Sequence, residues 1–419
     1  MSSTATPAAT RPSRLPLAVY VLAAGTFLMG TTEFVVAGLL PELADDFSTT
    51  EAGAGLSITV FAIGMILGSP VMPMLTLRLP QRTTLTLALA VYAVAHLVSA
   101  LTASFAVLLV TRFVAAVATG TFWAVAAVAA VALAGSRRSS TALGLVLGGG
   151  MLSTVVGVPL GAVGGQLVGW RGPFWCLAVL AAVTAVAVAR LVPPRSGAAA
   201  TPSIRSELSA LRSGRLWAVL LTCAAVTASV LSVYSFVSPL FTGRAGMSPA
   251  LVPLALVLFG TGAFVGNLVG GRWGDRRPLT TIVGAAAVSL VASAVLCLVS
   301  TSVVPALLAF ALLGLVGLSA NPVLVSLAVR LGGEGATLPS AMATSMFNLG
   351  TAVGTAVTGA LLGTSFGTLS PPVVGVAFGV LVLVPLTFVV LGRPRSTGGD
   401  EAAHPGRDDQ ELVTTGCSS

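Results

Sequence analysis

Long apolar runs of about twenty residues follow one another along most of this chain, separated by short polar connections. A run of that length can cross the hydrocarbon core of a bilayer as an α-helix. Only 8% of the 419 residues are charged, whereas soluble domains carry about 25%. Ten-residue segments of alternating polarity, the pattern of a membrane β-barrel, are absent from the sequence. The sequence therefore predicts an all-α membrane protein.

The apolar runs number about twelve and fall into two sets of six. The first set lies near 16–40, 53–77, 83–103, 105–133, 141–168 and 172–192, and the second near 216–242, 250–271, 279–300, 303–331, 337–363 and 371–392. We predict a segment 1–15, a six-helix half 16–192, a linker 193–215, a six-helix half 216–392 and a disordered tail 393–419. Two pseudo-symmetric halves are typical of a duplicated transporter with its binding site between them.

The charged residues of the connections are divided unequally between the two sides of the predicted membrane. Arginines gather in the first segment, the linker and the connections after the even spans: Arg11, Arg14, Arg78, Arg82, Arg137, Arg138, Arg195, Arg205, Arg212, Arg215, Arg272, Arg276, Arg277 and Arg330. The other side carries Arg171, Arg244 and four acids, Glu42, Asp45, Asp46 and Glu51. The positive-inside rule then places both termini in the cytoplasm, and we expect the protein in the cell membrane. Because these arginines occupy short connections, we expect the bilayer and not nucleic acid as the partner of the basic residues.

Two charges lie deep inside predicted spans. Glu33 is in span one and Arg112 in span four, each about seven residues from the external end, or roughly 10 Å below the outer surface. A charge at the centre of a spanning helix costs about 2.5–3.5 kcal/mol on insertion scales. Pairing would offset part of that cost, so we expect the two side chains to be partners. They form either a structural ion pair or a functional site.

A carboxylate in a partly dry cavity beside an arginine is suited to proton transfer, because desolvation and the cation act on its protonation in opposite directions. Moving one elementary charge through 100 mV supplies about 2.3 kcal/mol, which can drive uphill export of a solute. We therefore expect Glu33, with Arg112, to couple transport to protons and to recognise a cationic group.

The segment 144–170, which contains most of span five, is rich in small residues, and Pro159 removes one helical hydrogen bond. Its densest part includes Gly157, Gly161 and Gly165. This pattern indicates a kinked helix packed closely against its pseudo-symmetric partner, sealing a pathway, although tight packing alone also explains it.

Other intramembrane residues give weaker signals. Asn267, Asn321 and Asn348 are amides that either join neighbouring helices or face a cavity. Four aromatic residues are candidates for stacking on a solute: Phe122, Trp123, Tyr234 and Phe236. His96 in span three is either a packed polar residue or a proton carrier.

Several function classes lack their signatures in the sequence. There is no GxxxxGK[ST] phosphate loop, no arginine series of a voltage sensor, no filter-like loop and no nucleophile elbow. The four cysteines have no metal-site or disulfide spacing. We predict that the protein is not an enzyme and has no metal or cofactor, and that the proton gradient drives it.

Over about residues 15–393 the chain resembles the major facilitator superfamily, in particular its twelve-span drug:proton antiporters. The resemblance is carried by GTTEFVVAGLLPELADDF, LLVTRFVAAVATG, GVPLGAVGG, GWRGPFW and GNLVGGRWGDRR. It implies that Arg112 is the family's fourth-span arginine and that span five carries the antiporter motif with Gly157, Pro159, Gly161 and Gly165. It also implies a cytoplasmic gate of Arg78, Arg82, Gly271, Asp275 and Arg276. In the first-half loop, Leu77 stands where relatives carry aspartate.

Within the superfamily the sequence is most similar to the chloramphenicol-resistance exporters of actinobacteria, with arabinose-efflux-type permeases as close neighbours. The resemblance implies a monomer that exports a small amphiphilic drug, foremost chloramphenicol, by alternating access. Export of a sugar or another metabolite is the alternative within this class. A passive channel and a non-transporting membrane receptor are the alternatives outside it.

Overall fold

The computed structural model describes residues 15–76, 79–135, 138–194, 212–332 and 337–391. Within these ranges, twelve helical segments are long and apolar enough to cross a membrane, which confirms the predicted helix bundle. Most of their ends fall within a few residues of the expected boundaries, because hydropathy is a local property of the chain. The tail after Arg393, most of the linker and Arg78 lie outside the described residues.

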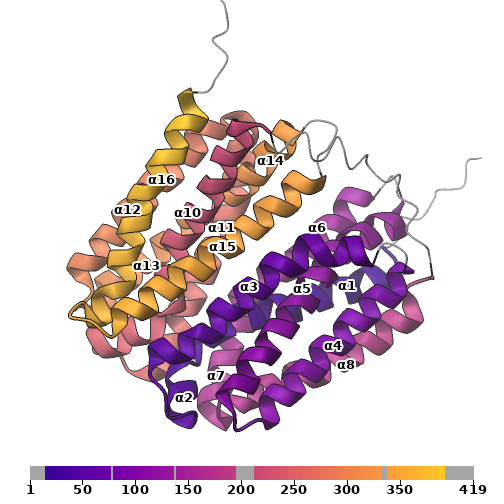
Figure 1. The fold of residues 1–419 in the computed structure, drawn as a ribbon, viewed down its shortest axis with the longest axis horizontal. Helices are drawn as coiled ribbons and strands as arrows, with labels where there is room; N and C mark the ends of the chain where they lie inside the picture. The colour runs from indigo at the N-terminus through magenta and orange to yellow at the C-terminus, as the bar shows by residue number, and fades with distance from the viewer. Residues whose placement is uncertain (1–14, 77–78, 136–137, 195–211, 333–336, 392–419) are drawn as a thin grey trace, which may run out of the picture.

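The first half contains spans one to six (Figure 1). Its elements are α1 (Leu17–Phe34), the 3₁₀ segment η1 (Val35–Gly38), α2 (Leu40–Asp46), α3 (Glu51–Leu75), α4 (Gln81–Leu101), α5 (Phe105–Ala134), α6 (Ser139–Leu152), the π segment η2 (Ser153–Gly157), α7 (Val158–Val168) and α8 (Arg171–Leu191). Span one is α1 with η1, and span five is α6, η2 and α7 in sequence.

The second half contains spans seven to twelve. Its elements are α10 (Gly214–Ser235), the π segment η3 (Pro239–Arg244), η4 (Pro249–Leu251), α11 (Val252–Arg276), α12 (Pro278–Val299), α13 (Val303–Gly317), α14 (Asn321–Gly332), α15 (Thr337–Leu362), η5 (Gly367–Leu369) and α16 (Ser370–Leu391). Span ten is split into α13 and α14, and the second piece begins at Asn321-Pro322.

Span five departs from a regular α-helix next to its proline. Pro159 has no N–H group for the carbonyl of Val155, and its ring would clash with that carbonyl in a regular α-helix. The chain widens into the π segment η2 just before this proline. The predicted kink therefore takes the form of a π-bulge.

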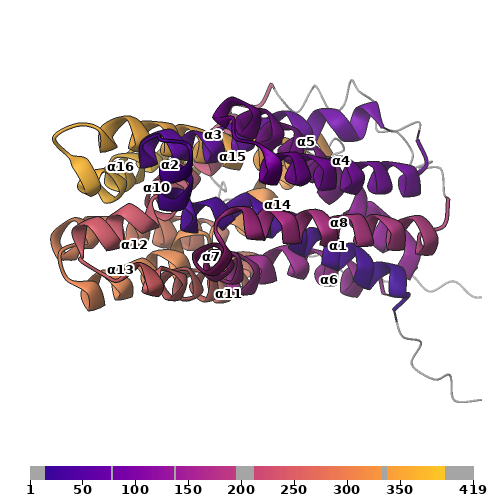
Figure 2. The same cartoon turned by 90° about the horizontal axis from the view of Figure 1, so that it is seen from below.

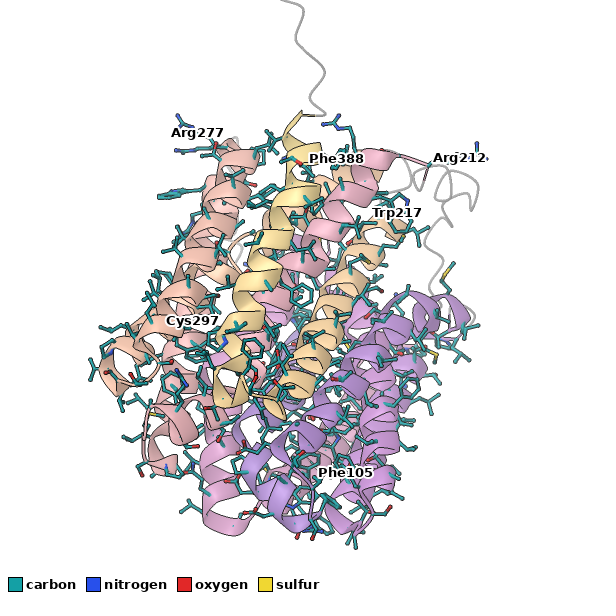
Figure 3. All side chains as sticks on the ribbon, turned by 60° about the vertical axis from the view of Figure 1, so that its left-hand side comes forward. Phe105, Arg212, Trp217, Arg277, Cys297 and Phe388 are labelled. Atoms are coloured by element: carbon teal, nitrogen blue, oxygen red, sulfur yellow. The ribbon has the colours of Figure 1, made fainter. Side chains whose placement is uncertain are left out.

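The two halves lie side by side, with α3 packed along α15 (Figures 1 and 2). We call the end of the bundle that carries Leu17, Leu191 and Gly214 the linker end, because the segment between the halves starts and finishes there, and the opposite end the far end. Arg212 and Arg277 lie at the linker end, and Phe105 lies toward the far end (Figure 3). In Figure 1 the ribbons of α3 and α15 are closest at the far end.

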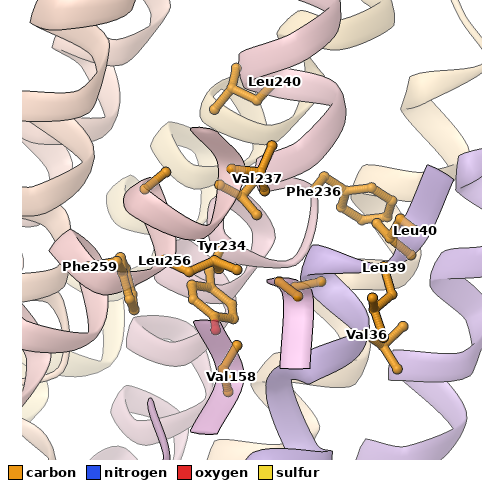
Figure 4. Packing of buried hydrophobic residues seen from close by; sticks show 14 of the residues in the cluster. Val36, Leu39, Leu40, Val158, Tyr234, Phe236, Val237, Leu240, Leu256 and Phe259 are labelled. Carbon is orange, nitrogen blue, oxygen red and sulfur yellow. The ribbon is translucent and has the colours of Figure 1, made fainter. Parts of the chain in front are cut away.

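The apolar core consists of three clusters, and only one of them joins the halves. The joining cluster lies toward the far end, where Val36 and Leu40 of the first half meet Phe236 and Leu256 of the second (Figure 4). Each of the other two clusters belongs to a single half and includes residues near the linker end, such as Ala18 and Leu216. The described residues therefore hold the halves together mainly at the far end.

Polar contacts between the halves extend from the far end toward the middle of the bundle. At the far end, the Gln166 side chain donates to the carbonyl of Pro249 at 2.8 Å. Further along α3, the hydroxyls of Thr59 and Thr355 are 2.8 Å apart. Beyond them, the Ser345 hydroxyl donates to the carbonyl of Ile66 at 3.2 Å.

Candidate functional site

Arg112 is the centre of a buried polar site in the first half. Its side chain projects from α5 and is only 1% exposed. One terminal nitrogen, Nη1, donates to the carbonyl of Thr32 at 3.0 Å and to its hydroxyl at 3.1 Å. The Nε atom lies 3.5 Å from the carbonyl of Ser57, a long contact, and the guanidinium stacks on Phe61 with its carbon 4.2 Å from the ring centre. Three helices, α1, α3 and α5, thus enclose the cation.

The end of α1 explains why a backbone carbonyl is available to Arg112. The last four carbonyls of an α-helix have no regular helical partner. Because α1 ends at Phe34 and continues as the 3₁₀ segment η1, Thr32 lies in that last turn. Its carbonyl accepts from a buried cation instead, which satisfies both groups.

The predicted ion pair between Glu33 and Arg112 is not formed in this structure. Among the residues that the structure describes, the single ion pair is Arg171–Asp46 at 2.6 Å, near the far end. Glu33 and Arg112 lie near enough to interact electrostatically, but their charged atoms are not in direct contact. Consecutive side chains of an α-helix point about 100° apart, and the guanidinium lies on the side of α1 that carries Thr32. Glu33 is half-buried, and the second terminal nitrogen of Arg112, Nη2, is buried without a partner.

Two of the four aromatic candidates lie where the halves meet. Tyr234 belongs to the joining cluster; its ring is 5.6 Å from that of Phe34, which follows Glu33 in the chain. Its hydroxyl is buried without a partner and interacts electrostatically with Glu33. Phe236 is fully buried at the same interface (Figure 4). The sequence singled out both residues, and the structure brings Tyr234 near Glu33.

The remaining candidates pack within their own halves. Phe122 is fully buried in the first half's core, where its ring fills the space beside Gly25. Trp123 fills the space beside Gly150, and its indole nitrogen is buried without a partner. Asn348 is 6% exposed and donates to the carbonyl of Thr344 at 3.0 Å. A solute-lining role for Phe122 has no support in this arrangement, because α1 covers the ring.

The glycines of span five allow it to approach span one. Three of them, spaced by four, form the glycine face: a side chain added at Gly157 would meet Thr31 and one at Gly161 would meet Val35, both in span one, and one at Gly165 would meet Leu39 just after it. The sequence pointed to the pseudo-symmetric counterpart of span five as the partner of this face. The structure instead places the glycine face against span one of the same half, because only small residues permit that backbone distance. Span five also contacts α11 of the second half.

The predicted gate residues lie at the linker end. Gly271 and Asp275 line a pocket of about 110 Å³ between α11 and α14, together with Arg330. Asp275 and Arg276 are exposed, and Arg82 in the first turn of α4 is half-exposed. Asp275 makes no ion pair within the described ranges.

A larger groove lies in the second half, away from the Arg112 site. It has a volume of about 1020 Å³ between α10, α15 and α16, and its walls include Trp217 and Phe388 on the outer surface of the second half (Figure 3). The lining is mostly apolar, as expected for a surface that faces lipid. No group of three or more metal-ligating side chains occurs among the residues with described positions.

Sequence reasoning overlooked Thr32, the residue that binds Arg112. Thr32 precedes Glu33 in the segment GTTEF. A threonine in a membrane helix does not by itself indicate a functional site. The place of Thr32 in the last turn of α1, where carbonyls need partners, is visible only in the structure, because the sequence predicts span one to continue to about residue 40.

Comparisons with known proteins agree with this architecture. Residues 22–344 and 246–414 match the family model described as Major Facilitator Superfamily. A chloramphenicol resistance protein from Streptomyces lividans is 37% identical over 360 residues, covering 85% of this chain and 92% of the relative. The inner membrane transport protein YdhP from Escherichia coli O157:H7 is 28% identical over 363 residues, covering 87% and 93%.

Among solved structures, a bacterial homologue of the human lysosomal transporter Spinster, in an inward-facing and unoccupied conformation, superposes with a TM-score of 0.68. It covers 90% of this chain and 95% of that protein, at 17% sequence identity. At that identity the similarity concerns the fold.

Proposed function

The chain belongs to the major facilitator superfamily, and from that premise we propose that it exports chloramphenicol, or a closely similar small amphiphilic antibiotic, in exchange for protons. The protein is a multi-pass membrane transporter and not an enzyme. The 37% identity to a chloramphenicol resistance protein supports the choice of substrate.

The observation that carries the proposal is the placement of Glu33. Its carboxylate is half-buried in a spanning helix and has no ion-pair partner among the described residues, while a buried guanidinium is bound one residue away. An unpaired carboxylate in such a place is costly unless it exchanges protons with water or a ligand. Phe34 and Tyr234 connect this position to the interface between the halves. Protonation of Glu33 is therefore well placed to influence how the halves pack.

The charge distribution supports an orientation for this exchange. Described arginines of the linker end include Arg82, Arg138, Arg215 and Arg330, whereas acids such as Asp46 lie at the far end. The positive-inside rule places the linker end and both termini in the cytoplasm. The far end, where the joining cluster holds the halves together, would then be external and closed. In this state Glu33 would receive drug and release its proton on the cytoplasmic side.

The proposal assigns roles to the other parts of the site. Arg112 acts with Glu33 in coupling, and the unpartnered hydroxyl of Tyr234 is available to a bound drug. The glycine face of span five supports span one, which carries Glu33. Asp275 and Arg276 belong to a gate at the linker end, opposite the closed far end. The transporter works as a monomer.

The test is expression in an antibiotic-sensitive host that lacks its own efflux pumps, with a panel of drugs that includes chloramphenicol and a set of sugars. Three forms are compared: wild type, Glu33→Gln and, as a matched control, Glu51→Gln at the far end of α3. We expect wild type and the control to confer chloramphenicol resistance and Glu33→Gln to confer none. In inside-out vesicles, collapse of the proton gradient should abolish accumulation, which excludes a passive channel. Full pH-driven export by Glu33→Gln would refute the role of Glu33, and sugar transport without drug resistance would refute the substrate.

A further inference from the structure

His96 is a buried imidazole with two defined hydrogen-bond partners. It projects from α4 and is 1% exposed. Its Nδ1 atom lies 2.9 Å from the carbonyl of Tyr92, and its Nε2 atom lies 2.6 Å from the hydroxyl oxygen of Thr32. That same hydroxyl oxygen accepts from Arg112 at 3.1 Å. The four groups form one continuous chain of hydrogen bonds.

The partners fix the direction of every bond in this chain. A carbonyl oxygen only accepts, so Nδ1 of His96 carries the proton and donates to Tyr92. In the neutral ring, Nε2 is then the acceptor, and the proton that it accepts is the hydroxyl proton of Thr32. With its proton directed toward His96, the Thr32 oxygen presents a lone pair to Arg112. A Thr32 hydroxyl that pointed its proton at the guanidinium would instead set donor against donor.

The imidazole is held rigidly enough to impose this direction. The His96 ring stacks on Tyr92 with centres 4.0 Å apart, and Phe174 of α8 lies 5.5 Å away on another side. One turn along both helices, the Tyr92 hydroxyl donates to the carbonyl of Leu28 at 2.9 Å. Residues 28 and 32 of α1 thus contact residues 92 and 96 of α4 in the same register. This ladder fixes the last turn of α1, including the backbone that precedes Glu33.

The chain ends at a backbone carbonyl, which decides between the two roles considered for His96. A proton relay needs a group on each side that both accepts and releases a proton. The Tyr92 carbonyl is already bound by Nδ1 and has no proton to pass on. The arrangement therefore suits orientation and not conduction.

We infer that His96 is a positioning residue: it orients the hydroxyl of Thr32 so that Thr32 holds Arg112 apart from the carboxylate of Glu33. The inference rests on the proposed roles of Glu33 and Arg112 in coupling. Its consequence is that the charge on Glu33 depends on a residue of α4 that neither binds the drug nor transfers the coupled proton. The bond from Nη1 to the Thr32 carbonyl does not depend on the side chain, so loss of the hydroxyl bond weakens the hold on Arg112 and lets the guanidinium move toward the only nearby carboxylate among the described residues.

Two pairs of variants separate orientation from mere packing. Glutamine at position 96 places an acceptor where Nε2 lies, whereas asparagine reaches only as far as Nδ1. His96→Gln therefore keeps the bond to Thr32, and His96→Asn loses it. Likewise Thr32→Ser keeps the hydroxyl, and Thr32→Val removes it at almost unchanged volume. Glutamine at position 96 cannot take up and release a proton as histidine does, and neither can serine at position 32.

The readout is the protonation of Glu33, measured without any drug. In lipid-reconstituted protein, infrared difference spectra against pH follow the carbonyl band of the protonated carboxyl, which is identified by its loss in Glu33→Gln. The other titratable or charged groups around the site are Tyr92 on α4, Arg112 on α5 and Tyr234 on α10. None of them gives a carboxyl band, and the bands of the other acidic residues, which Glu33→Gln retains, are removed by subtracting its spectra, so the difference reports Glu33.

We expect His96→Asn and Thr32→Val to move the midpoint of this band to lower pH, by on the order of 1 pH unit, because a guanidinium that approaches a carboxylate favours its charged form. His96→Gln and Thr32→Ser should titrate like wild type. The double variant His96→Asn/Thr32→Val should move the midpoint no further than Thr32→Val alone, since His96 acts through Thr32. Melting temperatures, recorded in parallel, verify that each variant is folded.

Two outcomes overturn the inference. One is an unchanged or higher midpoint in Thr32→Val, and the other is a shift in His96→Gln as large as that in His96→Asn. Because the titration needs no substrate, its result is independent of the drug-resistance test. Expected midpoint shifts in a protein that confers no resistance would refute the proposed substrate and leave the positioning role of His96 in place.

Discussion

Substitution of Gly55 by alanine should weaken the contact that closes the far end. Gly55 of α3 faces the ring of Phe236 across the interface between the halves. A Cβ atom at position 55 would lie 2.8 Å from the ring's outermost carbon, about 0.6 Å inside the 3.4 Å at which ordinary contact begins. The ring cannot retreat freely, because Phe236 is fully buried in the joining cluster.

The cost follows from this overlap. Extra methyl groups in well-packed interiors cost about 1–3 kcal/mol. If the closed far end exchanges with an open form, as alternating access requires, the ratio of closed to open should fall about 5–150-fold. The contact is lost in the open form, so the methyl group has no counterpart cost there.

The assay is a distance measurement by electron spin resonance between labels at the far end, on Leu167 of the first half and Thr364 of the second, both exposed. The background carries no other cysteine. Gly284→Ala is the matched control, because a Cβ there meets nothing within 4 Å. We expect longer distances in Gly55→Ala and unchanged distances in the control.

A rescue variant completes the design. Phe236→Leu removes the outer edge of the ring, so the combination with Gly55→Ala should restore much of the short-distance population. Distances in Gly55→Ala that match wild type would refute the reasoning, and so would a longer distance that Phe236→Leu leaves unchanged.

Two further predictions concern charged residues. Arg112→Lys should reduce pH-driven transport in inside-out vesicles at least 10-fold, because an ammonium cannot reproduce the planar fork that bonds Thr32 and stacks on Phe61; transport at the wild-type rate would contradict this. Burial raises the pKa of Glu42, which lies in α2 outside the spans, so the folded state loses stability as pH rises through that raised value. Glu42→Gln should therefore melt at a higher temperature than wild type near pH 8 and at the same temperature near pH 4, and a difference of equal size at both pH values would exclude this cause.

The sequence predicted where the two deep charges lie but not which residues they contact. Hydropathy located Glu33 and Arg112 on spans one and four, and counting residues gave them similar depth, because rise per residue is constant along a helix. Depth does not fix which way a side chain points around the helix axis. The structure turns Arg112 to Thr32, so the expected ion pair is replaced by hydrogen bonds to an uncharged residue.

Span five shows the same division. The glycine spacing and Pro159 predicted a kinked helix in close contact with another, and the structure contains a π segment just before that proline and the close contact. The identity of the neighbour was not available from the spacing, because any helix with a complementary surface fits a face of small residues. Span one is the neighbour, with Thr31, Val35 and Leu39 in matching register.

The sequence by itself determined the membrane class, the twelve spans and the family, since these depend on the local composition of each segment and on motifs within it. Only the tertiary structure decided which residues share the site of Arg112. The chain that runs from Tyr92 through His96 and Thr32 to Arg112 joins three helices. Such a chain depends on the rotation and register of each helix against the others, which many packed side chains set together and which no single segment encodes.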